Sequence, residues 1–352
     1  MKLLKSSLLL FVVLGFSASL LNAQPRSLTY WSIGVNVGTM YYQGDLDDHG
    51  FEPWIGLRED NSKWGSPFRL LRPGFGAQAM YHFNPHMNVS LGLNYGWIGA
   101  ADSLAREEGD NEFRRFRNLD FRNRIFEASA ILNYEFFATD RHYRFRPNWS
   151  PYIFAGVAVF YHNPFTYLRD EEIEFYSQDP AVGDLSAYED ERIFLHDLRT
   201  EGQGSDCEEC DDQYSLVQIA IPVGVGVRFK LTEKMDLRFS AGVRKTFTDH
   251  LDDVGSYYYA DPEGYLEGRL DSEDPILSYI VSDRSGYRQI YNVNGNDNSG
   301  FQVQQADISR GRPINEDFGE KRGFPNQDDW YAIVGFTVSY IIDPGDRCPK
   351  FR

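Results

Sequence analysis

The segment Met87-Asn-Val-Ser-Leu-Gly-Leu-Asn-Tyr-Gly-Trp97 alternates an apolar residue with a small or polar one along its whole length. Successive side chains of a β-strand point to opposite faces of a sheet, so this pattern predicts a strand with one apolar face. The same period of two recurs at residues 31–38, 74–83, 126–136, 217–231, 235–244 and 330–340. Residues 151–162 are apolar on both faces, so the pattern does not determine their register. The sequence therefore predicts eight strands.

Three features favour an outer-membrane barrel over a secreted β-sandwich. Most segments run ten residues or more, which is long for a soluble strand and suits a tilted membrane strand. Aromatic residues such as Trp31, Trp97 and Trp330 lie at segment ends, as the interfacial girdles of a membrane barrel require. The connections alternate between short turns at 84–86, 138–149 and 232–234 and long loops at 43–73, 100–118, 164–213 and 250–328.

The predicted fold is all-β: an eight-stranded antiparallel transmembrane β-barrel with long acidic extracellular loops and short periplasmic turns. An open sheet in lipid would leave unpaired backbone edges, so the eight strands are expected to close. Eight strands enclose a lumen that side chains fill. The lumen-facing side of the segments carries charged residues, and we favour an internal salt-bridge plug over a conduction path. These residues are Glu127, Glu135, Arg228, Arg238 and Arg244.

The N-terminus has the layout of a secretory signal peptide. Lys2 and Lys5 precede an apolar core at residues 8–16, and small residues follow up to Ala23. We expect residues 1–23 to be a signal peptide cleaved near Ala23. The barrel would then span residues 24–342, followed by a periplasmic tail at 343–352. This organisation predicts that the protein resides in the outer membrane of the cell.

The negative charge is concentrated in two of the long loops. The chain has 52 acidic against 35 basic residues, which disfavours nucleic acid as a partner. Loop 164–213 holds 16 acidic and 3 basic residues, and loop 250–328 holds 15 acidic and 7 basic residues. The simplest interpretation is that these loops are solvated. The alternatives are bridging to anionic lipopolysaccharide by divalent cations and docking of a cationic partner.

Two sequence patterns are candidate metal or catalytic sites. Cys207 and Cys210 form a Cys-Glu-Glu-Cys pair, for which a disulfide or free thiols are favoured over a metal site, and Cys348 has no obvious partner. Asp249 and His250 form a candidate general-base dyad at the barrel rim, and a loop-anchoring hydrogen-bond network is the favoured interpretation. We predict no catalytic residue, no cofactor and no metal, and no enzymatic activity.

The turn at 138–149 is basic and aromatic, which a minimal barrel does not require. Arginine and aromatic residues are enriched at interface hot spots, so Arg141, Arg144, Arg146 and Trp149 are candidate partner-binding residues. The alternative is an amphipathic turn that lies at the level of the lipid headgroups.

Seven further motifs follow in order along the chain: Tyr42-Gln-Gly-Asp-Leu46, Arg72-Pro-Gly-Phe-Gly76, Arg117-Asn-Leu-Asp-Phe-Arg-Asn123, Pro151-Tyr-Ile-Phe-Ala-Gly-Val157, Leu198-Arg-Thr-Glu-Gly-Gln-Gly204, Tyr214-Ser-Leu-Val-Gln218 and Arg244-Lys-Thr-Phe-Thr-Asp-His-Leu-Asp-Asp-Val254. In these motifs the chain resembles the PorG family, small outer-membrane barrels of the type IX protein secretion system of Bacteroidota. The acidic expansion at 164–213 and the tail at 343–352 depart from the family pattern.

The resemblance implies a non-enzymatic role in protein secretion and, in some species, gliding motility. It also implies association with the periplasmic ring of the proteins PorK and PorN. A barrel in the outer membrane is itself expected to contact outer-membrane lipids and lipopolysaccharide. Two alternatives stay open. One is a generic small barrel that serves adhesion or membrane integrity, and the other is a hydrolase at the barrel rim.

Overall fold

The computed structural model describes residues 29–46, 72–102, 117–139, 142–178, 182–204, 212–255, 272, 274–282, 284, 322–323 and 327–342. Eight long strands dominate these residues: β1 (Tyr30–Gln43), β2 (Arg72–His82), β3 (Met87–Ala101), β4 (Asp120–Glu135), β5 (Trp149–Tyr161), β8 (Val217–Lys230), β9 (Met235–Thr246) and β10 (Trp330–Ile342). The predicted signal peptide, the predicted C-terminal tail and all three cysteines lie outside the described residues.

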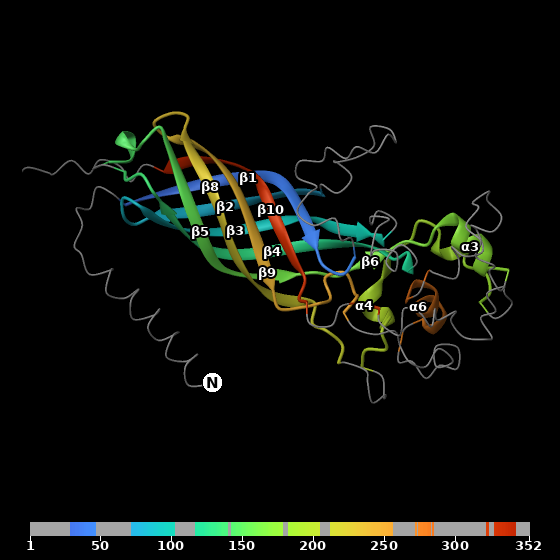
Figure 1. The fold of residues 1–352 in the computed structure, drawn as a ribbon. Coiled ribbons are helices and arrows are strands. Elements are labelled where there is room, and N and C mark those ends of the chain that lie inside the picture. Colours follow the sequence, from blue (N-terminus) through green and yellow to red (C-terminus); the bar gives the residue numbers. More distant parts are fainter. Residues whose placement is uncertain are drawn as a thin grey trace, which may run out of the picture.

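The eight strands close into an antiparallel barrel (Figure 1). Each strand pairs with its neighbour in the chain, and β1 pairs with β10 over thirteen residue pairs from Trp31–Ile342 to Gln43–Trp330. Because no long strand is left with an open edge, every strand finds backbone partners on both sides. The predicted eight-stranded closed barrel is confirmed.

Strand β5, whose register the sequence left open, is apolar on both faces because its inward side chains are aromatic. Tyr152, Phe154 and Phe160 are buried inside, whereas Ile153 and Val157 face outward. The β5–β8 pairing is interrupted between Ala155–Val223 and Ala158–Ala220. The interruption falls at Pro222, which has no backbone N–H to donate to the ladder.

Glycines on β8 and β9 make room for these rings. A Cβ placed at Gly224 or Gly242 would lie within about 2.5 Å of the Phe154 ring, and one at Gly226 would meet the Tyr152 ring at 2.3 Å. The small inward face that the sequence shows is therefore the complement of two large side chains on β5.

Ion pairs fill the lumen toward the end with the tight turns. The carboxylate of Glu135 accepts from Arg228 Nε at 2.8 Å and from Arg238 Nη2 at 2.6 Å. Arg146 adds a pair with Asp236 at 2.9 Å between Nε and Oδ1. All of these side chains are nearly inaccessible to solvent. The lumen is blocked here by buried pairs of opposite charge.

A second plug lies nearer the end with the long loops. Glu127 is fully buried and accepts from Tyr331 Oη at 2.8 Å and from Asn94 Nδ2 at 2.8 Å. Arg244 Nε lies 3.3 Å from the same carboxylate. Between the plugs remains a cavity of about 80 Å³, lined in part by Asn133 and Ser240. The predicted salt-bridge plug is confirmed, and it consists of two layers.

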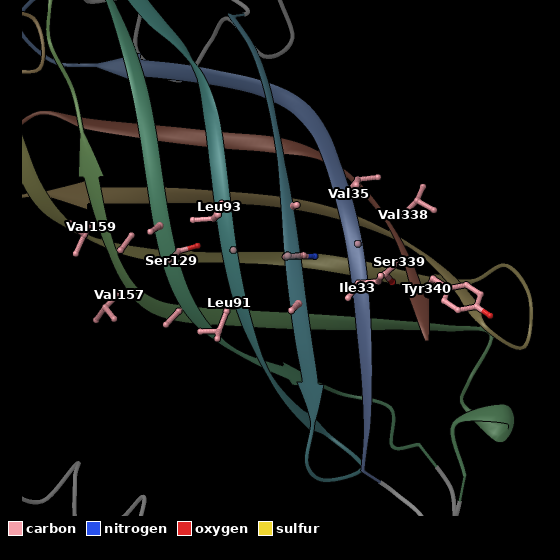
Figure 2. Close-up of a pocket in the computed structure, with 18 residues that line it drawn as sticks. Ile33, Val35, Leu91, Leu93, Ser129, Val157, Val159, Val338, Ser339 and Tyr340 are labelled. Atoms are coloured by element: carbon pink, nitrogen blue, oxygen red, sulfur yellow. The ribbon is translucent and has the colours of Figure 1, made fainter. Parts of the chain in front are cut away.

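The outer surface of the barrel is an apolar belt. Figure 2 shows Val35, Leu93, Val157 and Val159 directed away from the barrel, with alanine on the strands between them. Val35 and Val157 are more than 60% exposed. Exposed aliphatic side chains over six neighbouring strands make a surface that water would disfavour and hydrocarbon would cover.

The long-loop end carries a folded cap. It comprises β6 (Phe165–Thr166), α3 (Asp170–Tyr176), η5 (Ser186–Tyr188), β7 (Ile193–Phe194), α4 (Leu195–Leu198) and α6 (Pro275–Ser282). In Figure 1 the labelled elements of this cap lie beyond one end of the barrel. Its apolar side chains, such as Leu195 and Ile280, join one buried cluster with Phe121 and Ile98 at the barrel mouth.

The solvated-loop prediction for residues 164–213 is correct only in part. Asp170 and Glu171 are exposed on α3, but Glu172 and Glu201 are buried. A short 3-10 helix, η4 (Tyr143–Phe145), lies at the opposite end of the barrel. Among the described residues, no helix has the length and hydropathy needed to cross a membrane.

The lower plug gives a stability prediction. Replacing Glu135→Gln leaves Arg228 and Arg238 buried without the carboxylate that both contact, which should lower the free energy of unfolding by about 3 kcal/mol. Urea denaturation of the refolded barrel in lipid vesicles, followed by tryptophan fluorescence, measures the change. The control is Glu233→Gln, which removes an exposed carboxylate from a tight turn. Equal midpoints for the two variants would contradict the account.

Candidate functional site

A buried polar network ties the cap to the barrel mouth, and Asp252 lies at its centre. The hydroxyl of Tyr42, near the end of β1, lies 2.6 Å from Asp252 Oδ2 and 3.0 Å from Asp329 Oδ1. Asp252 also accepts the backbone N–H groups of Leu46 and Val254, and Asp329 accepts that of Leu251. The two carboxyl groups thereby hold together β1, the segment after β9 and the residue before β10.

The neighbouring Asp253 connects the same segment to the cap. Its carboxylate accepts from Thr200 Oγ1 at 2.5 Å and from Tyr214 Oη at 2.7 Å. Glu201 accepts the backbone N–H of Gly255 at 3.1 Å. Each contact joins the loop after β9 to the segment between β7 and β8, so the loops are mutually braced.

Two buried arginines complete the network. Arg117 donates to both oxygens of Asp102, at 2.7 and 2.8 Å, and to the backbone oxygens of Asp45 and Arg322. Arg322 in turn donates to Glu201 Oε1 at 3.1 Å and to the backbone oxygen of Asp253. Because guanidinium groups present several donors in one plane, each arginine links segments that are far apart in the chain.

Three residues in or next to the network have an unusual backbone conformation. Asn118, Arg199 and Asp253 have φ values of 58°, 52° and 67°. Non-glycine residues rarely adopt this left-handed region, and they persist there when the surroundings over-determine them. All three residues lie in motifs that carry the PorG resemblance, so these motifs mark the residues that shape the barrel mouth.

Carboxylates outnumber cations in the network, and this excess raises the pKa of several carboxyl groups. Burial and the neighbouring carboxylates raise the pKa of Asp252 and Asp329 above the usual range. Burial and the same neighbours raise the pKa of the half-buried Asp249 to about 8. The geometry agrees, because one Tyr42 hydroxyl proton cannot serve two ionised carboxylates at once. Burial and mutual repulsion therefore favour the protonated form of the Asp252–Asp329 pair.

The candidate dyad of Asp249 and His250 is not formed. The His250 ring stacks on Tyr214 with centroids 4.7 Å apart, and no carboxylate of the described residues hydrogen-bonds to it. Asp252 and Asp253 are directed to the partners given above. The favoured interpretation of this segment as a loop anchor is confirmed. Within the described residues, no group of three or more His, Cys, Asp or Glu side chains has metal-binding geometry.

At the opposite end, the turn before β5 divides into a buried and an exposed part. Arg146 is 2% exposed. In addition to its pair with Asp236, it donates to the backbone oxygens of Tyr143, Thr232, Glu233 and Met235. Its guanidinium lies inside the barrel end rather than on a partner-binding surface.

The remaining surface of this turn is basic and aromatic. Phe145 is 72% and Trp149 51% exposed, and the Arg144 side chain is 45% exposed. Arg141, the fourth candidate, lies outside the described residues. The structure thus separates Arg146, a structural residue, from a neighbouring surface made by Arg144, Phe145 and Trp149.

Comparison with protein families decides the class of the protein. The family described as outer membrane protein beta-barrel domain matches residues 8–260. The chain belongs to this family. Its barrel therefore spans the outer membrane, and the apolar belt of Figure 2 faces lipid. Outer-membrane barrels have short periplasmic turns and long extracellular loops, so we expect the cap to be extracellular and the turn at 142–149 to be periplasmic.

Solved outer-membrane barrels are similar to the chain at low identity. They include the attachment invasion locus protein Ail of Yersinia pestis, at 8% identity and a TM-score of 0.30, covering 89% of this chain and 97% of that one. Neisserial surface protein A has 11% identity and a TM-score of 0.30, with 88% of this chain and 96% of that one covered. OprG of Pseudomonas aeruginosa has 9% identity and a TM-score of 0.30, with 90% of this chain and 99% of that one covered. The search of curated proteins gave no match.

Sequence reasoning missed most members of the mouth network. Asp102, Asp329 and Arg322 follow no motif, and the partners of Asp329 and Arg322 lie 78 and 121 residues away in the chain. Tyr42, Arg117 and Thr200 lie inside motifs that the PorG resemblance singled out, but their chemical role there was not evident. Position within these motifs was the only signal available.

The raised pKa values predict that the extracellular cap loosens as pH rises. The closed network holds protons that the opened one releases, so its stability falls as pH rises through the raised values. Burial lowers the pKa of His162 to about 4. This shift makes the closed network more stable as pH rises, but only below about pH 6.5, the pKa of an unperturbed histidine. The amides of residues 251–255 should therefore lose hydrogen-exchange protection between pH 6.5 and 9.

Two variants test the origin of this loss. Asp252→Asn combined with Asp329→Asn removes the titrating pair and should reduce the pH dependence, with Asp249 left to titrate. Asp184→Asn removes a fully exposed carboxylate of the cap and should leave it unchanged. Protection factors, corrected for the intrinsic pH dependence of exchange, give the readout. Constant or rising protection in the unmodified protein would contradict the raised pKa values.

Proposed function

We propose that this outer-membrane barrel is a non-enzymatic component of the type IX protein secretion system that anchors a periplasmic ring of PorK and PorN type. The observation that carries the proposal is the combination of a closed lumen with an exposed basic and aromatic turn on the periplasmic side. A barrel of this kind acts through its ends and its outer surface.

The closed lumen argues against a role as the secretion conduit itself. Two layers of buried ion pairs cross the lumen, and the cavity between them is about 80 Å³. Opening it would strand buried charges, which costs several kcal/mol for each broken pair. Transport of a protein through this lumen is incompatible with such packing, whereas an anchoring role is compatible with it.

The PorG resemblance supports the same role. Its motifs converge on one structural unit, in which Tyr42, Arg117, Thr200 and Tyr214 all contact the loop after β9 or its immediate neighbours. The motifs of these residues therefore lie in one structural unit of this chain, in which a substitution at one position would disturb the others.

The periplasmic turn offers a contact surface of suitable chemistry. Arg144, Phe145 and Trp149 provide one cation and two exposed aromatic rings, the residue types that dominate protein interfaces. Beneath them, Arg146 fixes the turn through five acceptors, so the surface is preorganised. Preorganisation lowers the entropic cost of binding a partner.

Deletion of the gene tests the proposal as a whole. In a species with type IX secretion, we expect cargo proteins that bear the C-terminal secretion signal to accumulate in the periplasm. The alternative of a generic barrel for adhesion or membrane integrity predicts intact secretion and altered surface properties. Normal secretion after deletion would therefore contradict the proposal and favour this alternative.

Variants of the turn test the contact. Arg144→Glu combined with Phe145→Ala should reduce the ring protein that copurifies with the barrel by at least tenfold, because interface hot spots cost 2 kcal/mol or more when truncated. Lys234→Glu lies on the neighbouring periplasmic turn and makes the same change of charge. It should leave copurification intact. Equal loss in both variants, or no loss in either, would rule out this turn as the contact.

A further inference from the structure

Four arginines gather on the outer face of the barrel at its extracellular end, in a chain of net charge −17. They are Arg72 at the start of β2, Arg122 and Arg124 on β4, and Arg192 just before β7. We call this set the arginine ledge. Within the described residues, none of the four has a carboxylate within 4 Å, although the neighbouring Arg169 and Arg284 both pair with Asp120.

The register places the arginine ledge directly above the aromatic girdle. Arg124 pairs across the sheet with Trp97, and Phe126, two residues further on toward the periplasm, pairs with Tyr95. Alternation along β4 puts Arg122 and Arg124 on the same outward face as the lipid-exposed Phe126. Aromatic girdles lie at the membrane–water interface. The guanidinium groups are therefore level with the headgroups of the outer leaflet.

The arginines lie close together although they repel one another. Gly99 of β3 lies between them and pairs with Arg122, and a Cβ at Gly99 would be 3.5 Å from Arg72 Nη2. The Arg72 guanidinium therefore lies close to Gly99, beside Arg122 of β4. The guanidinium groups of Arg72 and Arg122 are close enough to repel each other.

Aromatic rings of the cap hold the other guanidiniums in place. Arg122 lies 4.8 Å from the centroid of the Tyr167 ring, and Arg124 and Arg192 each lie 5.7 Å from that of Phe165. A ring face orients a cation without neutralising its charge. The Nε atoms of Arg72 and Arg124 are buried and have no hydrogen-bond partner among the described residues.

We propose that the arginine ledge binds the phosphate groups of lipopolysaccharide in the outer leaflet. Guanidinium groups donate hydrogen bonds to phosphate in a bidentate fashion. A phosphate bound here would neutralise these arginines, which have no carboxylate nearby in the described part of the chain. The acyl chains of the same lipid would continue downward over the apolar belt beside Leu93. One amphiphilic ligand thus matches both surfaces.

The test measures retention of lipid A by the full-length mature protein in phosphatidylcholine nanodiscs. Bisphosphorylated lipid A and lipid A stripped of both phosphates are compared by native mass spectrometry. We expect the phosphorylated form to be retained in preference. Arg122→Gln combined with Arg124→Gln should reduce its retention on the order of 30-fold, since each arginine near an anionic surface contributes about fivefold.

Two controls keep the result interpretable. Arg122→Lys combined with Arg124→Lys preserves the charge but weakens the stacking on the rings, and it should restore most of the binding. Lys230→Gln combined with Lys234→Gln removes two charges at the periplasmic end and should have no effect. Heat-modifiable mobility on gels confirms that each variant is folded.

Three results would overturn the proposal. The first is equal retention of the phosphorylated and stripped lipids, and the second is retention by the Gln variant equal to that of the unmodified protein. The third is displacement of lipid A by millimolar inorganic phosphate, which would make the arginine ledge a site for free anions rather than for a lipid.

Discussion

In a bilayer every backbone polar group of a spanning segment has to be satisfied within the protein, and an eight-stranded sheet meets this demand only by closing on itself. Closure at eight strands leaves a lumen so narrow that side chains must fill it. Any charge on the inner face is then buried, and it needs a partner. The pairs of Glu135 with Arg228 and Arg238, and of Glu127 with Arg244, follow from that constraint.

The same constraint applies at the extracellular mouth, where the barrel meets a folded cap rather than open solvent. Here carboxyl groups exceed the buried cations, and the excess is accommodated by shared protons and backbone N–H donors around Asp252 and Asp329. The extracellular end is thus held by a network sensitive to protonation, whereas the lumen is held by ion pairs. The outer face of the same end carries the arginine ledge, so charge of opposite sign is separated across the barrel wall.

Most of the barrel could be predicted from the sequence because period-two alternation is a local signal. The strands around Leu91, Ala128 and Val225 follow directly from it, and so do the charges of the lumen. Strand β5 was predicted without its register because Tyr152 and Phe154 fill the lumen with apolar rings, which removes the contrast between its faces. The signal there was the set of glycines on β8 and β9, but a glycine does not reveal which ring it accommodates.

The mouth and the periplasmic turn were less predictable because their contacts span the chain. Arg146 looked like a surface arginine beside Arg144, and only the fold shows that its guanidinium enters the barrel end. The acidic segment 164–213 looked like solvated loop, since composition does not tell which carboxylates will be buried. Glu201 and Asp253 find their partners only when the loops after β7 and β9 meet over the mouth.

We propose that this barrel works through its ends and outer surface while its lumen stays closed. Ion conductance in planar lipid bilayers tests that claim most directly. The purified protein should insert without producing a steady conductance step at neutral pH, under conditions in which a wide porin gives clear steps. A stable open channel from the unmodified protein would show that the two layers of ion pairs do not close the lumen, and it would contradict the account.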